Sequence, residues 1–134
     1  RDYVLTQNFD YLLVVRPQSA TEMECKDIAK AIHKELVKNT NCEYLTTYWF
    51  IEKNNKQKTE FSSQYHLHML LQTDVKTNFT YIGKRAIKDL MGGAPFLQKY
   101  NNDKWSYSGK KYSVKQVSEY SMLGYETFRK RKKH

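Results

Sequence analysis

Apolar positions change their spacing along the chain, and each spacing predicts a different kind of element. Residues 9–16 (FDYLLVVR) form a β-rich apolar run that a proline ends, which predicts a buried strand. Dense β-branched and aromatic residues predict strands at 44–52 (YLTTYWFIE) and 65–72 (YHLHMLLQ), which we expect to pair antiparallel across a polar loop. Weaker patterns predict short strands at 96–100 and 105–107.

Three other segments have the three- and four-residue spacing of amphipathic helices. They cover residues 21–38, 77–91 and 113–123. Capping-box patterns begin the first and third segments, and glycines follow the second and third, the last of them Gly124. The resulting order of elements, β-α-β-β-α-β-α, predicts an α+β fold in which helices flank a central antiparallel β-sheet.

The positive charge of the chain is concentrated in its second half. Lysine and arginine together number 23 and aspartate and glutamate 14, a net charge of +9. Residues 1–52 carry 6 basic and 8 acidic side chains (net −2), so residues 53–134 carry the other 17 and 6 (net +11). A composition that is 40% hydrophobic and 14% aromatic excludes a disordered basic tail, so we expect an ordered domain that binds a polyanion.

The length of the chain and its hydrophobic pattern limit the other classes of protein to which it can belong. A chain of 134 residues without a linker or repeat predicts one domain over 1–134, which the basic run at 129–133 could connect to the rest of a longer protein. No apolar run approaches the roughly 20 residues that span a bilayer, and no secretory signal opens the chain. Cys25 and Cys42 have neither metal-binding nor redox spacing, which favours an intracellular protein.

The candidate chemistry centres on the His-Leu-His sequence at 66–68. Alternate side chains of a strand point to one face, so both imidazoles project together and offer two nitrogen ligands to a divalent ion. Glu52 ends the strand expected to pair with this one and is the third ligand that we favour, while Glu60 and Gln64 in the loop compete with it. Such a ligand set suits Mn²⁺ or Mg²⁺. An ordinary pair of surface histidines is the alternative interpretation.

A site that cuts a phosphodiester bond also needs a nucleophile. Tyr120 is the first candidate among the eleven tyrosines, because the predicted third helix would hold its phenol at the edge of the sheet. Tyr112 and Tyr125 are weaker candidates. The alternative role of Tyr120 is that of a core or rim residue.

With these residues in view, the chain resembles the HUH endonuclease domain of rolling-circle replication initiators, the Rep proteins of small single-stranded DNA viruses and plasmids. The resemblance covers nearly the whole chain and rests on FDYLLVVRP, on YWFIE before YHLHMLLQ, and on VSEYSMLGYE. It implies a ferredoxin- or RRM-like fold and a Mn²⁺ or Mg²⁺ ion held by His66, His68 and Glu52. It also implies that Tyr120 nicks and rejoins single-stranded DNA through a covalent 5′-phosphotyrosine.

The chain departs from this family at one position. The family's nucleophile motif reads tyrosine, two residues, lysine, whereas Leu123 stands three residues after Tyr120. Tyr112 with Lys115 satisfies the spacing but precedes the predicted helix. A relaxase or single-tyrosine transposase is the related alternative, and a non-catalytic single-strand-binding domain is the alternative from another class. Leu70, where a third alternating histidine would stand, argues against a histidine-triad hydrolase.

The basic surplus supplies candidate contacts to DNA, with aromatic side chains stacking on bases. The resemblance implies that the partner is single-stranded DNA of an origin or hairpin, in a bacterial cytoplasm or a host nucleus. The alternative is that many of these residues are solvated surface charges. The candidate contacts are Lys84, Arg85, Lys88, Trp105, Tyr107, Lys110, Lys111, Tyr112 and Lys115.

Overall fold

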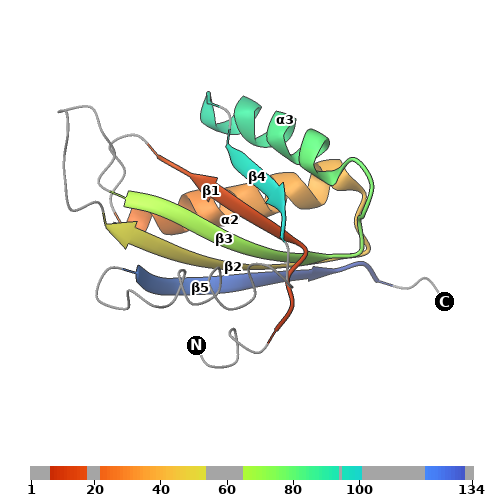
Figure 1. The fold of residues 1–134 in the computed structure, drawn as a ribbon, viewed down its shortest axis with the longest axis horizontal. Coiled ribbons are helices and arrows are strands. Elements are labelled where there is room, and N and C mark those ends of the chain that lie inside the picture. Colours follow the sequence, from red (N-terminus) through yellow and green to blue (C-terminus); the bar gives the residue numbers. More distant parts are fainter. Residues whose placement is uncertain (1–6, 18–21, 54–64, 94, 101–119, 132–134) are drawn as a thin grey trace.

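The computed structural model describes residues 7–17, 22–53, 65–93, 95–100 and 120–131, and the structural statements below concern these residues. They form one sheet and two helices (Figure 1). The elements are β1 (Tyr11–Val15), α2 (Glu22–Thr40), β2 (Tyr44–Lys53), β3 (Tyr65–Thr73), α3 (Phe79–Met91), β4 (Phe96–Lys99) and β5 (Tyr120–Arg129).

The strands lie in the order β4-β1-β3-β2-β5, and every neighbouring pair is antiparallel. From β1 to β4 the elements follow the β-α-β-β-α-β order of ferredoxin-like folds, in which β3 inserts between β1 and β2. β5 extends this sheet along the outer edge of β2 (Figure 1). The predicted α+β class, with helices packed on a central antiparallel sheet, is confirmed.

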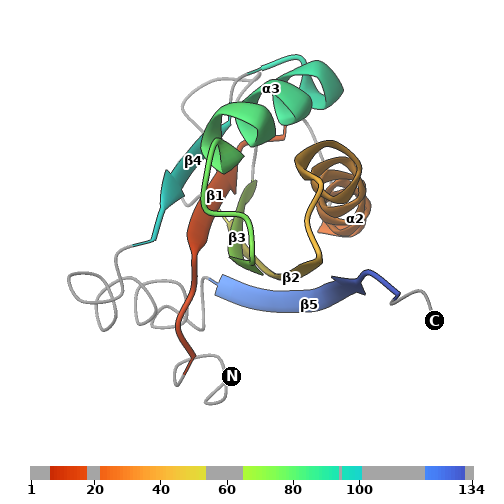
Figure 2. The same ribbon diagram turned by 90° about the vertical axis from the view of Figure 1, so that its right-hand side faces the viewer.

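Both helices lie on the same side of the sheet, which we call the helix face (Figure 2). Alternate strand residues point into it, and on β3 these are Leu67, Met69 and Leu71, all fully buried. They pack in one cluster with Ile32 and Leu36 of α2. Burying an aliphatic side chain of this size contributes about 1.5–3 kcal/mol, so this layer holds the fold together.

The opposite side of the sheet is the histidine face, named for His66 and His68 on β3. A smaller buried cluster packs there, in which the ring of Phe9 meets Tyr48 and Tyr100 edge-on, each at 5.9 Å between centroids. No helix in the described part of the chain covers this face (Figure 2). The cluster consists of Phe9, Tyr48, Phe50, Leu70 and Tyr100, with Leu12 packed against it.

The bounds of the first six elements differ from the predicted ones by at most two residues at either end. The glycine stop of α3 acts as expected: Gly92 has a left-handed φ of 73°, and its N–H donates to the Lys88 carbonyl at 2.8 Å. α2 ends at Thr40 and is followed by Asn41, whose φ is 53°.

The predicted third helix is wrong where the structure describes it. Residues 113–119 lie outside the described ranges, as does the predicted strand 105–107, but 120–123 belong to β5, which pairs with β2. Gly124 does not stop a helix; it lies within β5 beside a register shift, with a φ of 152°. A Cβ there would approach the Trp49 ring to 3.5 Å. Long pairing with β2 therefore outweighs the local helical spacing.

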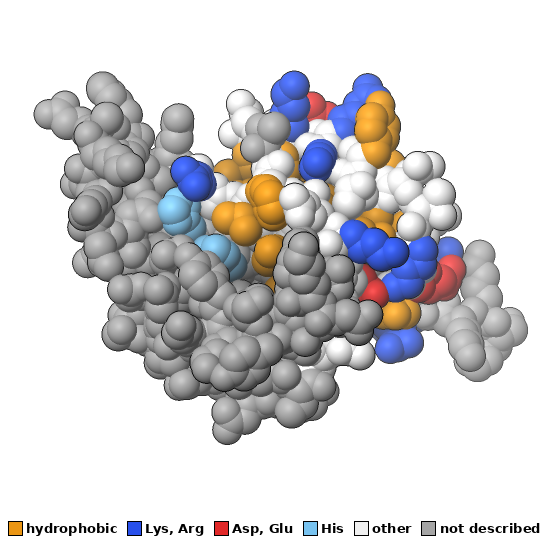
Figure 3. Space-filling view, viewed as in Figure 1, with side chains coloured by type: hydrophobic (Ala, Val, Ile, Leu, Met, Phe, Trp, Pro, Cys, Tyr) orange, Lys and Arg blue, Asp and Glu red, His pale blue; other side chains and the backbone are white. Residues whose placement is uncertain are grey.

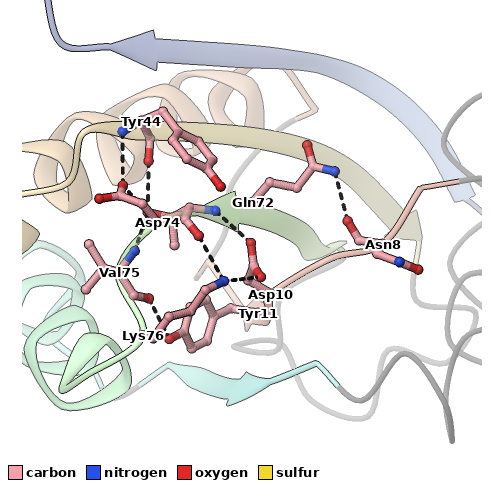
Figure 4. A network of polar contacts seen from close by, with 9 residues as sticks. Asn8, Asp10, Tyr11, Tyr44, Gln72, Asp74, Val75 and Lys76 are labelled. Atoms are coloured by element: carbon pink, nitrogen blue, oxygen red, sulfur yellow. Dashed lines mark hydrogen bonds and ion pairs between the residues drawn. The ribbon is translucent and has the colours of Figure 1, made fainter.

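A polar network fixes the end of β3 that lies away from the histidines (Figure 4). Asp74 Oδ1 accepts hydrogen bonds from the backbone N–H groups of Glu43 (2.9 Å) and Tyr44 (3.1 Å). Asp10 accepts from the Thr73 N–H at 2.8 Å and forms an ion pair with Lys76. Three chain segments that are distant in sequence are thus joined at the beginnings of β1 and β2 and the end of β3.

Candidate functional site

The site begins with two histidines on a strand whose orientation is fixed. His66 and His68 are half-buried on the histidine face, with their ring centroids 6.3 Å apart and their planes nearly perpendicular at 86°. Leu67 and Met69 between and beside them are fully buried on the helix face. A one-residue slip of β3 would bury both imidazoles and expose both apolar side chains, so the alternation sets the direction in which the histidines point.

Glu52 lies directly opposite His66. The antiparallel register of β2 and β3 pairs Glu52 with His66 and Phe50 with His68. Directly paired residues of an antiparallel sheet share one face, and their Cβ atoms lie about 4.5–5.5 Å apart. The predicted pairing of these two strands is confirmed, and it brings the favoured third ligand opposite the first of the two histidines of β3.

Tyr120 of β5 also pairs with Glu52, along the edge of β2 that is turned away from β3. His66, Glu52 and Tyr120 therefore occupy one cross-strand row on β3, β2 and β5, which we call the reactive row. Tyr120 reaches this position on a strand, not on the predicted helix. Of the two weaker candidates, Tyr112 lies outside the described residues.

Tyr125 is separated from the reactive row. It pairs with Tyr48, four residues along β2 from Glu52, and its ring lies 5.9 Å from that of Tyr48. At the rise of a β-strand, four residues correspond to roughly 13 Å. This separation argues against Tyr125 as a nucleophile for a phosphate held near His66.

The donor set fits a divalent ion by its chemistry, and the geometry of the rings limits the fit. A metal lies about 2.1 Å from an imidazole nitrogen, so two rings at about 90–110° around one ion have centroids about 4.5–5.5 Å apart. The observed 6.3 Å requires the rings of His66 and His68 to turn toward each other. Among the described side chains, no group of three His, Cys, Asp or Glu stands ready to hold a metal; the side chain of Glu52 is not among those described.

The predicted DNA contacts on α3 lie away from this row. Lys84, Arg85 and Lys88 are exposed on a helix of the opposite layer (Figure 2). Figure 3 shows Lys and Arg side chains at the top of the view, over α3, and the histidines at the left, with apolar side chains between them. A strand that touched both would have to bend around the β4 edge of the sheet. The remaining predicted contacts lie outside the described residues: Trp105, Tyr107, Lys110, Lys111, Tyr112 and Lys115.

Sequence reasoning overlooked a second cross-strand row. Phe96 of β4 pairs with Val14 of β1, which pairs with His68. Phe96 is 47% exposed although its neighbour Leu97 is buried. The sequence shows only an aromatic residue beside a leucine in a predicted short strand, and the registers of β4 and β1 are needed to relate Phe96 to the histidines.

Comparisons with models of protein families, with curated proteins and with solved structures find no match to this chain. The function is therefore inferred from the arrangement of the residues alone. In the part of the chain that the structure describes, no helix is both long enough and apolar enough to cross a membrane.

Proposed function

We propose that this chain is a metal-dependent endonuclease and strand transferase that nicks and rejoins single-stranded DNA, as at a rolling-circle origin. The single observation that carries the proposal is the reactive row, in which Tyr120, Glu52 and His66 are consecutive neighbours across three strands. Their separation in sequence makes this arrangement a product of the fold. His68 adds a second imidazole on the same face, two positions from His66.

The residues divide into a binding group and a nucleophile. His66, His68 and Glu52 would hold Mn²⁺ or Mg²⁺, which when bound polarises a phosphate oxygen. The Tyr120 oxygen attacks the phosphorus and forms a new P–O bond, and the P–O bond to the 3′ oxygen breaks. The phenol gives up its proton and the departing 3′ oxygen gains one, leaving a 5′-phosphotyrosine and a 3′-hydroxyl. The same atoms run in reverse rejoin the strand.

Charge supports DNA as the polyanion. The chain carries a net charge of +9, and its second half contributes all of the surplus. The preference for single strands rests on two exposed aromatic side chains of the histidine face, Phe96 and Tyr125, which no described helix covers. Exposed aromatic side chains on a sheet can stack unpaired bases. The compartments that suit this role are a bacterial cytoplasm or a host nucleus.

A covalent-adduct assay tests the proposal. The chain is incubated with end-labelled single strands from a random pool and Mn²⁺, and a labelled band that survives denaturing electrophoresis is the expected result. Tyr120→Phe should abolish the band, while the matched control Tyr81→Phe, an exposed tyrosine on α3, should leave it unchanged. His66→Ala should remove the response to Mn²⁺. A band that persists in Tyr120→Phe and disappears in Tyr112→Phe would move the nucleophile to Tyr112.

A non-catalytic single-strand-binding domain is the second candidate. The observation that favours it is the exposed aromatic Phe96 in the same row as His68. Tight binding of strands from the pool, without an adduct under any metal condition, would establish this function and reject the endonuclease.

A further inference from the structure

A cavity of about 850 Å³ opens at the end of the sheet where β1 finishes. It lies between the first half of α2 and the end of α3, next to the start of β4. Its lining combines the apolar residues Ile28, Leu90, Met91 and Phe96 with the charged residues Arg16 and Glu24. Ligand sites commonly fall between about 300 and 1,000 Å³, so the cavity can hold a nucleotide-sized group.

Exposed apolar side chains gather at this cavity. Leu90 and Phe96 are 42% and 47% exposed, unlike most large apolar side chains in the described part of the chain. They come from different elements, α3 and β4, and both line this cavity. Apolar side chains from separate elements that converge on one opening mark a contact surface.

One residue of the cavity lining, Phe96, shares a cross-strand row with His68, while the helix walls of the cavity belong to the opposite layer. Phe96, Val14 and His68 are consecutive neighbours across β4, β1 and β3, so two steps between strands separate Phe96 from His68. Two such steps cover about 10 Å. An extended single strand bridges that distance with about one or two nucleotides.

Arg16 brings positive charge to the same end. It follows Val15 directly, and Val15 pairs with Leu67, the residue between the two histidines. A guanidinium group binds phosphate oxygens in a bidentate manner. Glu24 also lies in the lining, so the phosphate belongs on the Arg16 side of the cavity.

We propose that this cavity is a subsite for one unpaired nucleobase of the bound strand, with the base stacked on Phe96 and its phosphate bound by Arg16. The proposal rests on the proposed function in one respect, because it takes the strand to cross the sheet at His66 and His68. An aromatic ring and a cation at one opening match a nucleotide better than a purely apolar protein segment, and the positive charge of the chain favours the same partner.

Binding of strands with single abasic sites tests the subsite. A labelled strand selected from a random pool for binding is prepared with one abasic site at each position in turn, and affinities are measured by fluorescence anisotropy without metal. One abasic position should weaken binding to the wild-type chain about tenfold. The Phe96→Ala variant should bind the intact strand about tenfold more weakly than the wild type does, and the abasic site at that position should not weaken its binding further. The Phe96→Tyr variant should show the same affinities as the wild type for the intact and the abasic strands.

Two further variants complete the design. Tyr81→Ala removes an exposed aromatic about 14 Å along α3 from Leu90 and should bind every strand like the wild type. Arg16→Gln should lower the slope of log affinity against log salt by about one. Thermal unfolding of each variant checks that the fold is intact.

The outcomes separate the subsite from the endonuclease. If Phe96→Ala and Arg16→Gln bind all strands as the wild type does, the cavity is not a base subsite, while adduct formation at Tyr120 is unaffected. If the position-specific loss appears but no adduct forms, the subsite stands and the endonuclease fails. If no single strand binds at all, both proposals are rejected.

Discussion

The two faces of β3 differ in how deeply their side chains are buried. On the helix face, Leu67 and Met69 are fully buried against the helices. On the histidine face, His66 and His68 are half-buried, and no described helix lies over them. Because alternate residues divide the two tasks, one strand can stabilise the fold with one set of side chains and present polar groups with the other.

The two faces also treat polar groups differently. On the helix face, His33 of α2 is buried with its Nδ1 2.9 Å from the Thr47 hydroxyl on β2. Burial lowers the pKa of His33, and the carboxylate of Glu126 on β5 acts in the opposite direction. A histidine is therefore tolerated there as a neutral, paired side chain, whereas the proposed role of His66 and His68 is to bind a cation.

The largest expected effect is a loss of stability when Leu67, the neighbour of His66 on the helix face, is shortened. Leu67→Ala should lower the free energy of unfolding by about 3 kcal/mol, because the cavity it leaves lies in the main core. His66→Ala, one residue away, should cost less than about 1 kcal/mol while removing the metal response of the adduct assay. Urea unfolding of both variants measures the contrast. Equal losses of stability would mean that the histidine face carries as much of the fold as the helix face.

A second prediction concerns Asp74, which directly follows the last residue of β3. Asp74→Ala should destabilise the fold by about 1–3 kcal/mol, because the backbone N–H groups of Glu43 and Tyr44 lose their acceptor. Asp74→Asn should cost less, since its amide oxygen can still accept. Asp89→Ala, an exposed carboxylate on α3, is the matched control and should stay within about 0.5 kcal/mol of the wild type.

The lowered pKa of Asp74 predicts that the protein loses stability in acid. Burial alone would raise the pKa of Asp74, but hydrogen bonds from backbone N–H groups outweigh it and lower the pKa below 3.8. The stability that Asp74 contributes is therefore present above pH 3.8 and is lost as the pH falls through its lowered pKa. Acid unfolding of Asp74→Asn should lack this component, and identical acid profiles would contradict the assignment.

The third prediction uses the buried histidine of the helix face. The pKa of His33 is lowered from 6.5 in the folded state, so the unfolded chain takes up the proton first as the pH falls. Stability should be complete above pH 6.5 and decrease below it, toward the lowered pKa. His33→Gln should flatten this decrease. Free energies of unfolding above and below pH 6.5 for both chains give the test, and parallel curves would show that His33 is protonated equally in both states.

Much of the fold could be predicted because the decisive patterns are local. The stripe of α2 and the alternation of β3 extend over several turns or residues, so their elements follow from the sequence alone. The position of Glu52 opposite His66 could be predicted as well, because β2 and β3 follow one another in the chain and pair antiparallel.

The strand that begins at Tyr120 and the position of Phe96 relative to His68 could not be predicted, because they depend on contacts between distant segments. The stretch from Tyr120 to Gly124 reads locally as the end of a helix, since its apolar spacing and its glycine both suit one. Only the register with β2 makes Gly124 part of a strand and brings Tyr120 opposite Glu52. Phe96 likewise gains its relation to His68 through β1, which lies between their strands.

The smallest expected effect separates two adjacent threonines of β2. The hydroxyls of Thr46 and Thr127 lie 2.9 Å apart on the histidine face, and since this pair is exposed, water can replace the hydrogen bond. Thr46→Val should change stability by less than about 0.5 kcal/mol. Thr47→Val differs only in facing the helices, where it leaves His33 Nδ1 buried without its hydroxyl partner, at a cost of about 1–3 kcal/mol. If the two valine variants unfold at the same urea concentration, the distinction between the faces does not extend to β2.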